Sequence, residues 1–326
     1  MKKTSTLFLL IIFAILCYFT VDSYMKFYDS DLERPLASIS LDIDKTRIIL
    51  ITQDIDTPFW NKVAEGAKQQ AEMENIRLEV WGSYNNNITD FLRKLDIAIY
   101  SKVDGIIVQG LDTQEFKTLI KTKASSYGIP VITIAKDVPM EESLRRTYVG
   151  SNHYEAGKLI AQQLVQDLGD VGTVVIIYDG QIEHYQLERM KAIEDVLGNY
   201  PDINFQRIST EESLEQVMTA TQDMLNHYPD LDALIVVDSN ILGTVIQEVK
   251  RRYKIEPLLI YSFEDDYELS SYLAENQLDG YIEQSPEVMG SLSVKQMMEW
   301  LNGKAVPLKK EGYFTDIKLV KAKDLP

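Results

Sequence analysis

The side chains best able to do chemistry in this chain of 326 residues are three histidines and an acidic cluster. His153, His184 and His227 are scattered, and none stands at metal-ligand spacing from another. We therefore interpret them as surface or helix-end residues. The acidic residues 264–266 are better placed to cap a helix than to form a catalytic carboxylate pair, and they lack the spacing of calcium ligands.

Motifs of known catalytic sites are also absent from the sequence. There is no GxSxG, HExxH or Walker motif, and no GxGxxG follows a strand-like run. The single cysteine, Cys17, excludes a disulfide framework or a thiol pair within the chain. We predict no catalytic residue, no cofactor and no metal, and expect a binding protein rather than an enzyme.

The composition is that of a globular protein with a strong negative charge. The hydrophobic content of 45% and the length suit two domains of ordinary size. The formal net charge of −17 opposes binding to phosphate backbones and to anionic lipid headgroups. Nucleic acid is therefore not an expected partner.

The N-terminus has the pattern of an export segment. Lys2 and Lys3 precede an almost wholly apolar run at residues 7–21, and a charged region before a long apolar one is typical of export signals. No small-x-small cleavage pattern follows, so we favour a helix retained as a membrane anchor. Lipid attachment at Cys17 and conventional cleavage stay open, although Leu16 breaks the pattern of a lipid-modified signal.

The expected anchor covers residues 1–23, and a mixed, acidic linker covers residues 24–45. An anchor held by lysines in the cytoplasm would place the rest of the chain at the extracytoplasmic face of the cell membrane.

From residue 46 onward, short β-branched runs alternate with segments of helical periodicity. The expected strands lie at residues 47–52, 77–81, 105–108 and 131–134 in one series, and at 173–178, 203–208, 233–237, 258–262 and 280–283 in another. The expected helices lie at residues 58–73, where Pro58 suits the first turn, and at 88–100, 113–127, 154–168, 186–197, 213–228, 241–253, 264–275 and 286–301. Helical segments between strands predict an α/β fold with parallel sheets and right-handed crossovers, here in two sheets.

Residues 148–157 separate the two series and have the character of a hinge. Val149 and Gly150 suit the end of a strand, and Ser151 or Asn152 can cap the following helix. If the two series form two lobes, a ligand cleft lies between them, where strand ends and helix N-termini converge.

The predicted lobes exchange chain segments. Residues 46–150 with 285–310 form the N-terminal lobe, and residues 151–284 with 311–326 form the C-terminal lobe. The crossovers are expected near Gly150, Gln284 and Glu311, because the helix after Pro286 has no strand of its own lobe left to follow.

Four stretches resemble the type I periplasmic sugar-binding proteins, in the ribose-binding-protein group: residues 51–60, 128–133, 148–157 and 280–290. The resemblance extends over about residues 46–322. It implies two Rossmann-like lobes joined by three crossover segments, with a sugar held between them. Regulators of the lactose-repressor type share this core, but they carry an N-terminal DNA-reading domain where this chain has its apolar segment.

The resemblance also implies the ligand-binding residues. Phe59 and Trp60 match paired aromatics whose flat faces suit the C–H face of a sugar ring. Gln284 matches a ligand-contacting glutamine at a crossover, where an amide can donate and accept. The remaining implied contacts are Asp137, Asn152, Arg189, Asp238 and Glu264.

The chain departs from the group's pattern at three places. Ala135-Lys136 replaces an aspartate and its neighbour, Leu187 replaces an arginine, and Glu264 replaces an aspartate. Loss of charge-assisted partners indicates a retuned or degenerate pocket.

We therefore expect a receptor for a monosaccharide, a pentose or a hexose. The retained anchor and the short linker favour signalling to a membrane sensor such as a histidine kinase. The alternative is a substrate-binding component that delivers sugar to an ABC permease.

Overall fold

The computed structural model describes residues 16, 18–21, 45–180, 182–211, 213–252, 258–263 and 269–324. The chain forms two units, residues 1–45 and 46–326. In the first unit, residues 18–21 are helical, and Thr20 Oγ1 donates a hydrogen bond of 2.7 Å to the carbonyl oxygen of Leu16. Most of the predicted anchor and linker lies outside the described residues. Within the described residues, no helix combines the length and the apolar character that a membrane crossing requires.

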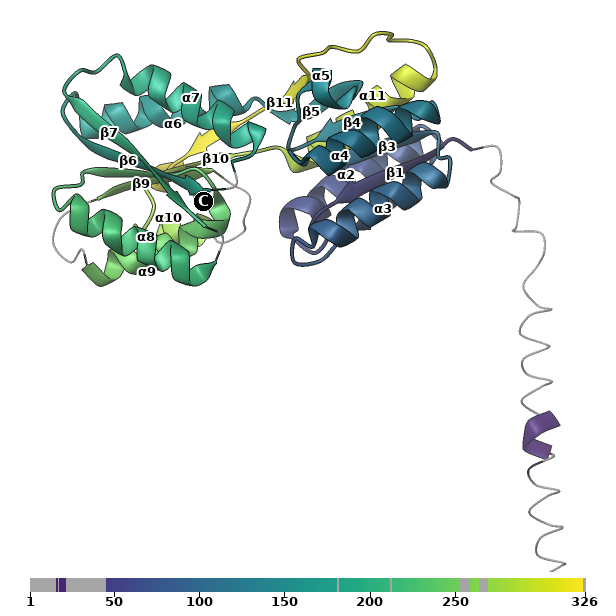
Figure 1. Cartoon of the computed structure of the whole chain (residues 1–326), viewed down its shortest axis with the longest axis horizontal. Coiled ribbons are helices and arrows are strands. Elements are labelled where there is room, and N and C mark those ends of the chain that lie inside the picture. The colour runs from purple at the N-terminus through teal and green to yellow at the C-terminus, as the bar shows by residue number, and fades with distance from the viewer. Residues whose placement is uncertain are drawn as a thin grey trace, which may run out of the picture. The chain divides into compact units, whose positions relative to one another are not determined.

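The second unit contains two separate β-sheets, and Figure 1 labels most of their strands. The first sheet has the order β11-β5-β4-β3-β1-β2. Its strands are β1 Arg47–Thr52, β2 Arg77–Gly82, β3 Gly105–Gln109, β4 Val131–Ile134, β5 Thr147–Ser151 and β11 Tyr313–Thr315. All of its pairings are parallel.

The second sheet has the order β12-β10-β9-β8-β6-β7. Its strands are β6 Gly172–Asp179, β7 Ile203–Thr210, β8 Ala233–Val236, β9 Leu259–Phe263, β10 Gly280–Glu283 and β12 Lys318–Val320. Its pairings are parallel except that of β10 with β12, which is antiparallel.

Helices pack on both faces of each sheet. The first lobe combines its sheet with α2 Pro58–Met73, α3 Ile88–Tyr100, α4 Gln114–Thr118, the π-helix η2 Leu119–Ala124, α5 Met140–Ser143 and α11 Pro286–Leu301. The second lobe combines its sheet with α6 His153–Leu168, α7 His184–Leu197, α8 Leu214–His227, α9 Ser239–Arg252 and α10 Leu269–Ala274, and a 3₁₀ turn, η3 Ala322–Asp324, follows β12.

The strand sequence itself divides each core into two layers. In β1, Ile49 and Ile51 join the cluster under α3, and Ile48 and Leu50 join the cluster under α2 and α11. This alternation follows from the two-residue period of a β-strand. A strand that is apolar on both faces is buried on both, as the continuous run at residues 47–52 predicts.

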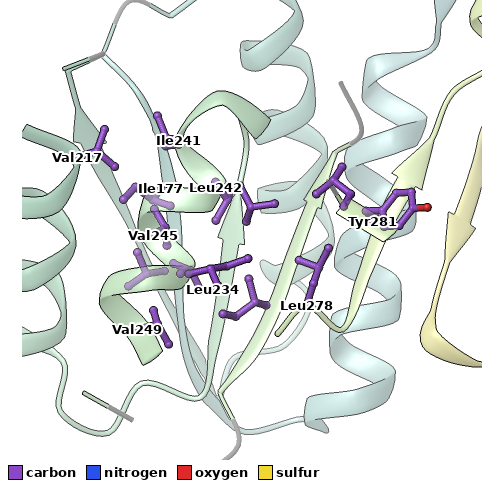
Figure 2. Close-up of a cluster of buried hydrophobic side chains, with 14 of the residues drawn as sticks. Ile177, Val217, Leu234, Ile241, Leu242, Val245, Val249, Leu278 and Tyr281 are labelled. Carbon is purple, nitrogen blue, oxygen red and sulfur yellow. The ribbon is translucent and has the colours of Figure 1, made fainter. Parts of the chain in front are cut away.

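In the second lobe, one such layer lies between the sheet and α9, as Figure 2 shows. Leu242, Val245 and Val249 are spaced three and four residues apart, so they share one face of α9. They pack over Ile177 of β6 and Leu234 of β8.

Two predictions differ from the structure by more than the end of an element. The third crossover was placed near Glu311, but β11 still pairs with β5 of the first sheet, so the chain changes lobe between Thr315 and Lys318. The helix predicted at residues 113–127 is α4 followed by the π-helix η2. Both differences depend on which backbone groups pair by hydrogen bonds, and periodicity does not specify those partners.

Candidate functional site

A cavity of about 90 Å³ lies where residues of both lobes meet. The first lobe contributes Asp54, Thr57, Phe59, Trp60, Asn86, Gln109, Ala135 and Lys136. The second lobe contributes His153, Tyr185, Arg189, Asp238 and Asn240. The wall therefore combines three aromatic rings with hydrogen-bond donors and acceptors, and both positively and negatively charged side chains are among them. Sugar sites require such a combination.

Strand ends explain why these residues meet. Gln109 is the last residue of β3, Ala135 directly follows β4, and Asp238 comes two residues after β8. The carboxyl ends of parallel strands lie at one edge of a sheet, which is where α/β folds bind ligands. The cavity is thus built at the carboxyl edges of the two sheets.

A second cavity of about 280 Å³ shares part of this wall, including Lys136, Tyr185 and Asp238. The Nζ atom of Lys136 lies 3.2 Å from Oε2 of Glu183 and 4.7 Å from the centre of the Tyr185 ring. Burial raises the pKa of the Glu183 carboxyl, and the Lys136 ammonium opposes that rise. Lys136 therefore stands where the two cavities adjoin and connects the two lobes.

A wider hollow of about 1400 Å³ lies beyond β6 and β7. Its wall includes the carboxylates of Glu211, Glu215 and Asp223 and no aromatic side chain. It therefore offers no ring on which a sugar could stack.

The N-terminus of α2 positions the two predicted aromatics. Thr57 caps the helix by accepting a hydrogen bond of 3.3 Å from the Trp60 amide, and Pro58 occupies its first turn. The rings of Phe59 and Trp60 meet edge to face, with centroids 5.4 Å apart. Trp60 is 7% exposed and also belongs to the core of the first lobe, whereas Phe59 is half-buried.

Arg189 of α7 is buried at the cavity wall. Its Nη1 donates to the carbonyl of Val237 at 3.0 Å, and its guanidinium carbon lies 4.9 Å from the Tyr185 ring centre and 4.2 Å from that of Phe263. Its Nε has no hydrogen-bond partner among the described residues. Buried donors are normally satisfied, so this atom marks Arg189 as a candidate ligand contact.

Asp238 is held by three donors. Its Oδ2 accepts from the Tyr185 hydroxyl at 2.8 Å and from Gln186 Nε2 at 3.1 Å, and its Oδ1 accepts from the Asn240 amide at 3.0 Å. These bonds fix the carboxylate at the cavity wall and orient the Tyr185 ring. The structure thus brings Phe59, Trp60, Arg189 and Asp238 together, four of the residues predicted from the sequence.

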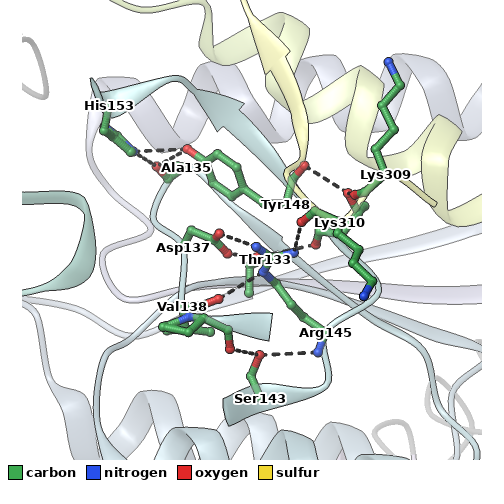
Figure 3. Close-up of polar contacts among 12 residues, drawn as sticks. Thr133, Ala135, Asp137, Val138, Ser143, Arg145, Tyr148, His153, Lys309 and Lys310 are labelled. Carbon is green, nitrogen blue, oxygen red and sulfur yellow. Dashed lines mark hydrogen bonds and ion pairs between the residues drawn. The ribbon is translucent and has the colours of Figure 1, made fainter. Parts of the chain in front are cut away.

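Asp137 does not line either cavity, and Figure 3 shows why. Its carboxylate accepts a hydrogen bond of 2.6 Å from Thr133 Oγ1 and forms an ion pair with Arg145. Arg145 also donates to the carbonyls of Val138 and Lys310, at 3.0 Å each. Burial raises the pKa of Asp137 against the opposing effect of Arg145. Asp137 therefore ties β4 to the segment before β11, outside both cavity walls.

Gln284 and Asn152 also lie outside the two cavity walls. Gln284 Oε1 accepts a hydrogen bond of 2.7 Å from Ser151 Oγ, which links the ends of β5 and β10. Asn152 caps α6 by accepting from the Glu155 amide at 3.1 Å, as the hinge pattern predicts. Both residues therefore belong to the crossover segments. Glu264 lies outside the described residues, and Leu187 is exposed on α7.

His153 stands at the end of a helix, as the sequence interpretation of the histidines expects, but it is not a surface residue. It begins α6, and its side chain is 7% exposed and lines the cavity. Burial, followed by the positive charge of Arg189, holds the pKa of His153 well below its usual value of 6.5. Its place directly after the capping Asn152 was the available signal, since helix N-termini converge on such sites.

Other wall residues were also missed, among them Asp54, Gln109, Lys136 and Asn240. Asp54, Gln109 and Lys136 follow or end a strand of a parallel sheet, and Asn240 lies in the first turn of α9, which follows β8; these places are the signal that could have identified them. Gln109 is held in place by accepting from Thr52 Oγ1 at 3.0 Å.

Comparison with known proteins agrees with this architecture. Residues 48–305 match the family model described as a periplasmic binding protein domain. The solved glucose-galactose binding protein GanP from Geobacillus stearothermophilus is 30% identical, with a TM-score of 0.80 over 87% of this chain and 99% of that one. The XylFII–LytSN complex, at 24% identity, gives a TM-score of 0.73 over 86% of this chain and 99% of that chain.

A curated relative, the xylitol-binding protein of Mycolicibacterium smegmatis, is 29% identical over 160 residues, which is 49% of this chain. The matched region covers 44% of that protein and 53% of a second relative, the D-apiose import binding protein of Actinobacillus succinogenes. The chain therefore spans about half the length of each of these relatives. Both relatives are binding proteins by name, not enzymes. The two-lobed fold, the family match and GanP together place this chain in the type I periplasmic sugar-binding proteins, in the ribose-binding-like group.

Proposed function

We propose that this protein is an extracytoplasmic receptor whose two lobes close on a monosaccharide, a pentose or a hexose. The observation that carries the proposal is the mixed wall of the smaller cavity, where Phe59 and Trp60 of one lobe face Tyr185, Arg189 and Asp238 of the other. Aromatic faces suit the C–H groups of a sugar, and the polar groups suit its hydroxyls. A ligand held from both sides favours the closed arrangement.

The names of similar proteins support this ligand class. Xylitol, D-apiose and glucose or galactose are the compounds named for the relatives described above. The departures from the ribose-binding group support a specificity that differs from that of the ribose-binding proteins, and among them Ala135 lies in the cavity wall.

Calorimetry against a panel of pentoses, hexoses and their polyols tests the proposal. We expect one or more of these compounds to bind, and we expect Phe59→Ala to lower the measured affinity, because the half-buried ring provides a stacking face. Tyr100→Ala removes an exposed aromatic on α3 and should leave binding unchanged. A folded protein that binds no member of the panel would refute sugar recognition.

We further propose that the sugar-closed form signals to a membrane sensor such as a histidine kinase. The support is the N-terminal apolar run at residues 7–21, whose sequence favours a retained anchor beside another membrane protein. A partner that binds the open and closed forms unequally is switched by the sugar alone.

The alternative partner is an ABC permease, to which the protein would deliver its sugar. Crosslinking in membranes with and without the bound sugar distinguishes the two. Capture of a sensor in a sugar-dependent manner supports signalling. Capture of a permease, with loss of sugar uptake on deletion, supports transport.

A further inference from the structure

The imidazole of His153 is fixed by contacts on one of its two nitrogens. Its Nε2 lies 3.1 Å from the carbonyl oxygen of Ala135 and 3.1 Å from the hydroxyl of Tyr148, as Figure 3 shows. The Tyr148 hydroxyl also lies 2.9 Å from the Ala135 carbonyl and 3.0 Å from that of Ser151. A carbonyl oxygen accepts only, so the hydroxyl can donate to either carbonyl and can accept from a protonated Nε2.

The same argument sets the tautomer of His153. Because the Ala135 carbonyl accepts only, Nε2 carries a proton and donates it. In a neutral ring the other nitrogen, Nδ1, is then an acceptor. Nδ1 is buried and has no hydrogen-bond partner among the described residues, although the ring lines the smaller cavity.

The surroundings keep the ring neutral. Burial has the largest effect on the pKa of His153, and Arg189, His184 and Lys136 add positive charge that lowers it further. Arg189 and Lys136 line the same cavity. A second proton on Nδ1 is thus opposed, and this nitrogen stays an acceptor.

We infer that His153 is a specificity-determining residue, whose Nδ1 accepts a hydrogen bond from a hydroxyl group of the ligand. The site then requires a donor at that position. A sugar lacking this hydroxyl leaves a buried acceptor unpaired, and a sugar acid with a carboxylate there presents a second acceptor. The inference rests on the proposed sugar-binding function and adds the chemical group that the site selects.

Two substitutions separate the acceptor from the shape of the ring. His153→Phe keeps a flat ring without any nitrogen, and the Ala135 carbonyl retains the Tyr148 hydroxyl as a donor. His153→Gln supplies an amide that can donate to Ala135 and an oxygen that can accept from the ligand.

The experiment measures the affinity of each variant for the sugar that binds best and for its series of monodeoxy analogues. In the unsubstituted protein, removal of one particular hydroxyl should weaken binding about tenfold or more. His153→Phe should abolish the discrimination at that position alone, and His153→Gln should restore part of it. Unchanged discrimination at every position in His153→Phe overturns the inference.

Nitrogen-15 spectra of the histidine rings give an independent reading that needs no ligand. We expect a neutral His153 with its proton on Nε2 in the sugar-free protein, and a shift of the Nδ1 resonance when sugar is added. A proton on Nδ1, or a bound sugar that leaves Nδ1 unshifted, overturns the role of His153 while sugar binding stands. If no sugar binds, the proposed function is refuted, and the protonation of the His153 ring can still be measured in the sugar-free protein.

Discussion

The ammonium group of Lys136 lies 3.2 Å from Oε2 of Glu183, so an ion pair joins the loop after β4 to the residue that caps α7. The two residues belong to different lobes, and the side chains are 25% and 21% exposed. A pair that links the lobes exists only while they are close together. It therefore favours the closed arrangement, with or without sugar.

Glu183→Gln should weaken sugar binding by about 1 kcal/mol, because a partly exposed ion pair contributes at most roughly that much. The sugar-free protein should also become more open, which small-angle scattering can measure. Glu188→Gln changes the same helix without touching either cavity and serves as the control. An unchanged affinity and radius of gyration would show that the pair does not favour closure.

Asp137→Asn should lower the free energy of unfolding by about 3 kcal/mol, because it leaves the buried Arg145 without its counter-charge. Sugar affinity should stay within about twofold, since Asp137 lines neither cavity. Urea denaturation and calorimetry measure the two quantities. Asp90→Asn, which removes a partly exposed carboxylate paired with Arg93 and Lys94, should have a much smaller effect on stability. A large loss of affinity with intact stability would instead support Asp137 as a ligand contact.

His153 predicts a pH dependence of stability. Its folded-state pKa is well below 6.5, so between 6.5 and that lower value the unfolded chain binds a proton that the folded protein does not. The free energy of unfolding should therefore fall as the pH drops below about 6.5, by up to about 1.4 kcal/mol per pH unit.

His153→Phe removes this contribution. The stability of this variant relative to the unsubstituted protein should therefore rise as the pH is lowered from 7 to 5. Urea denaturation at several pH values gives the comparison. His227→Phe removes an exposed histidine at the end of α8 and provides the reference variant. Parallel pH profiles for the unsubstituted protein and His153→Phe would contradict the buried neutral ring.

Gly290→Ala should destabilise the first lobe by about 2 kcal/mol, because an added methyl group would overpack the contact between α11 and α2. A Cβ atom at Gly290 would lie 1.9 Å from the carbonyl oxygen of Val63, and one at Gly66 would lie 1.9 Å from that of Glu287. Denaturant midpoints measure the effect. Lys68→Ala, on the exposed face of α2, should change the midpoint little.

Local patterns were sufficient to predict most of the elements. The apolar periodicity predicted α3 at residues 88–100 and α11 at 286–301, and the structure has the same bounds. Pro58 marked the first turn of α2, which places Phe59 and Trp60 at the cavity. These features depend on neighbours within a few residues, and so one sequence contains the information needed.

The site required non-local information. Ala135 adopts a left-handed backbone conformation, with φ of 63°, and after this turn Lys136 lines the cavity while Asp137 meets Arg145. Two adjacent polar residues thus have opposite roles, and neither composition nor periodicity distinguishes them.

The sequence by itself determined most of the strands and helices and their alternation, because these follow from local periodicity and helix capping, and the resemblance to the sugar-binding family indicated the aromatic pair. Only the tertiary structure decided that Gln284 pairs with Ser151, 133 residues away, and that His153 is buried at the cavity. Contacts between segments so far apart form only when the lobes pack, and that packing determines which polar groups are satisfied by the protein and which are left for a ligand.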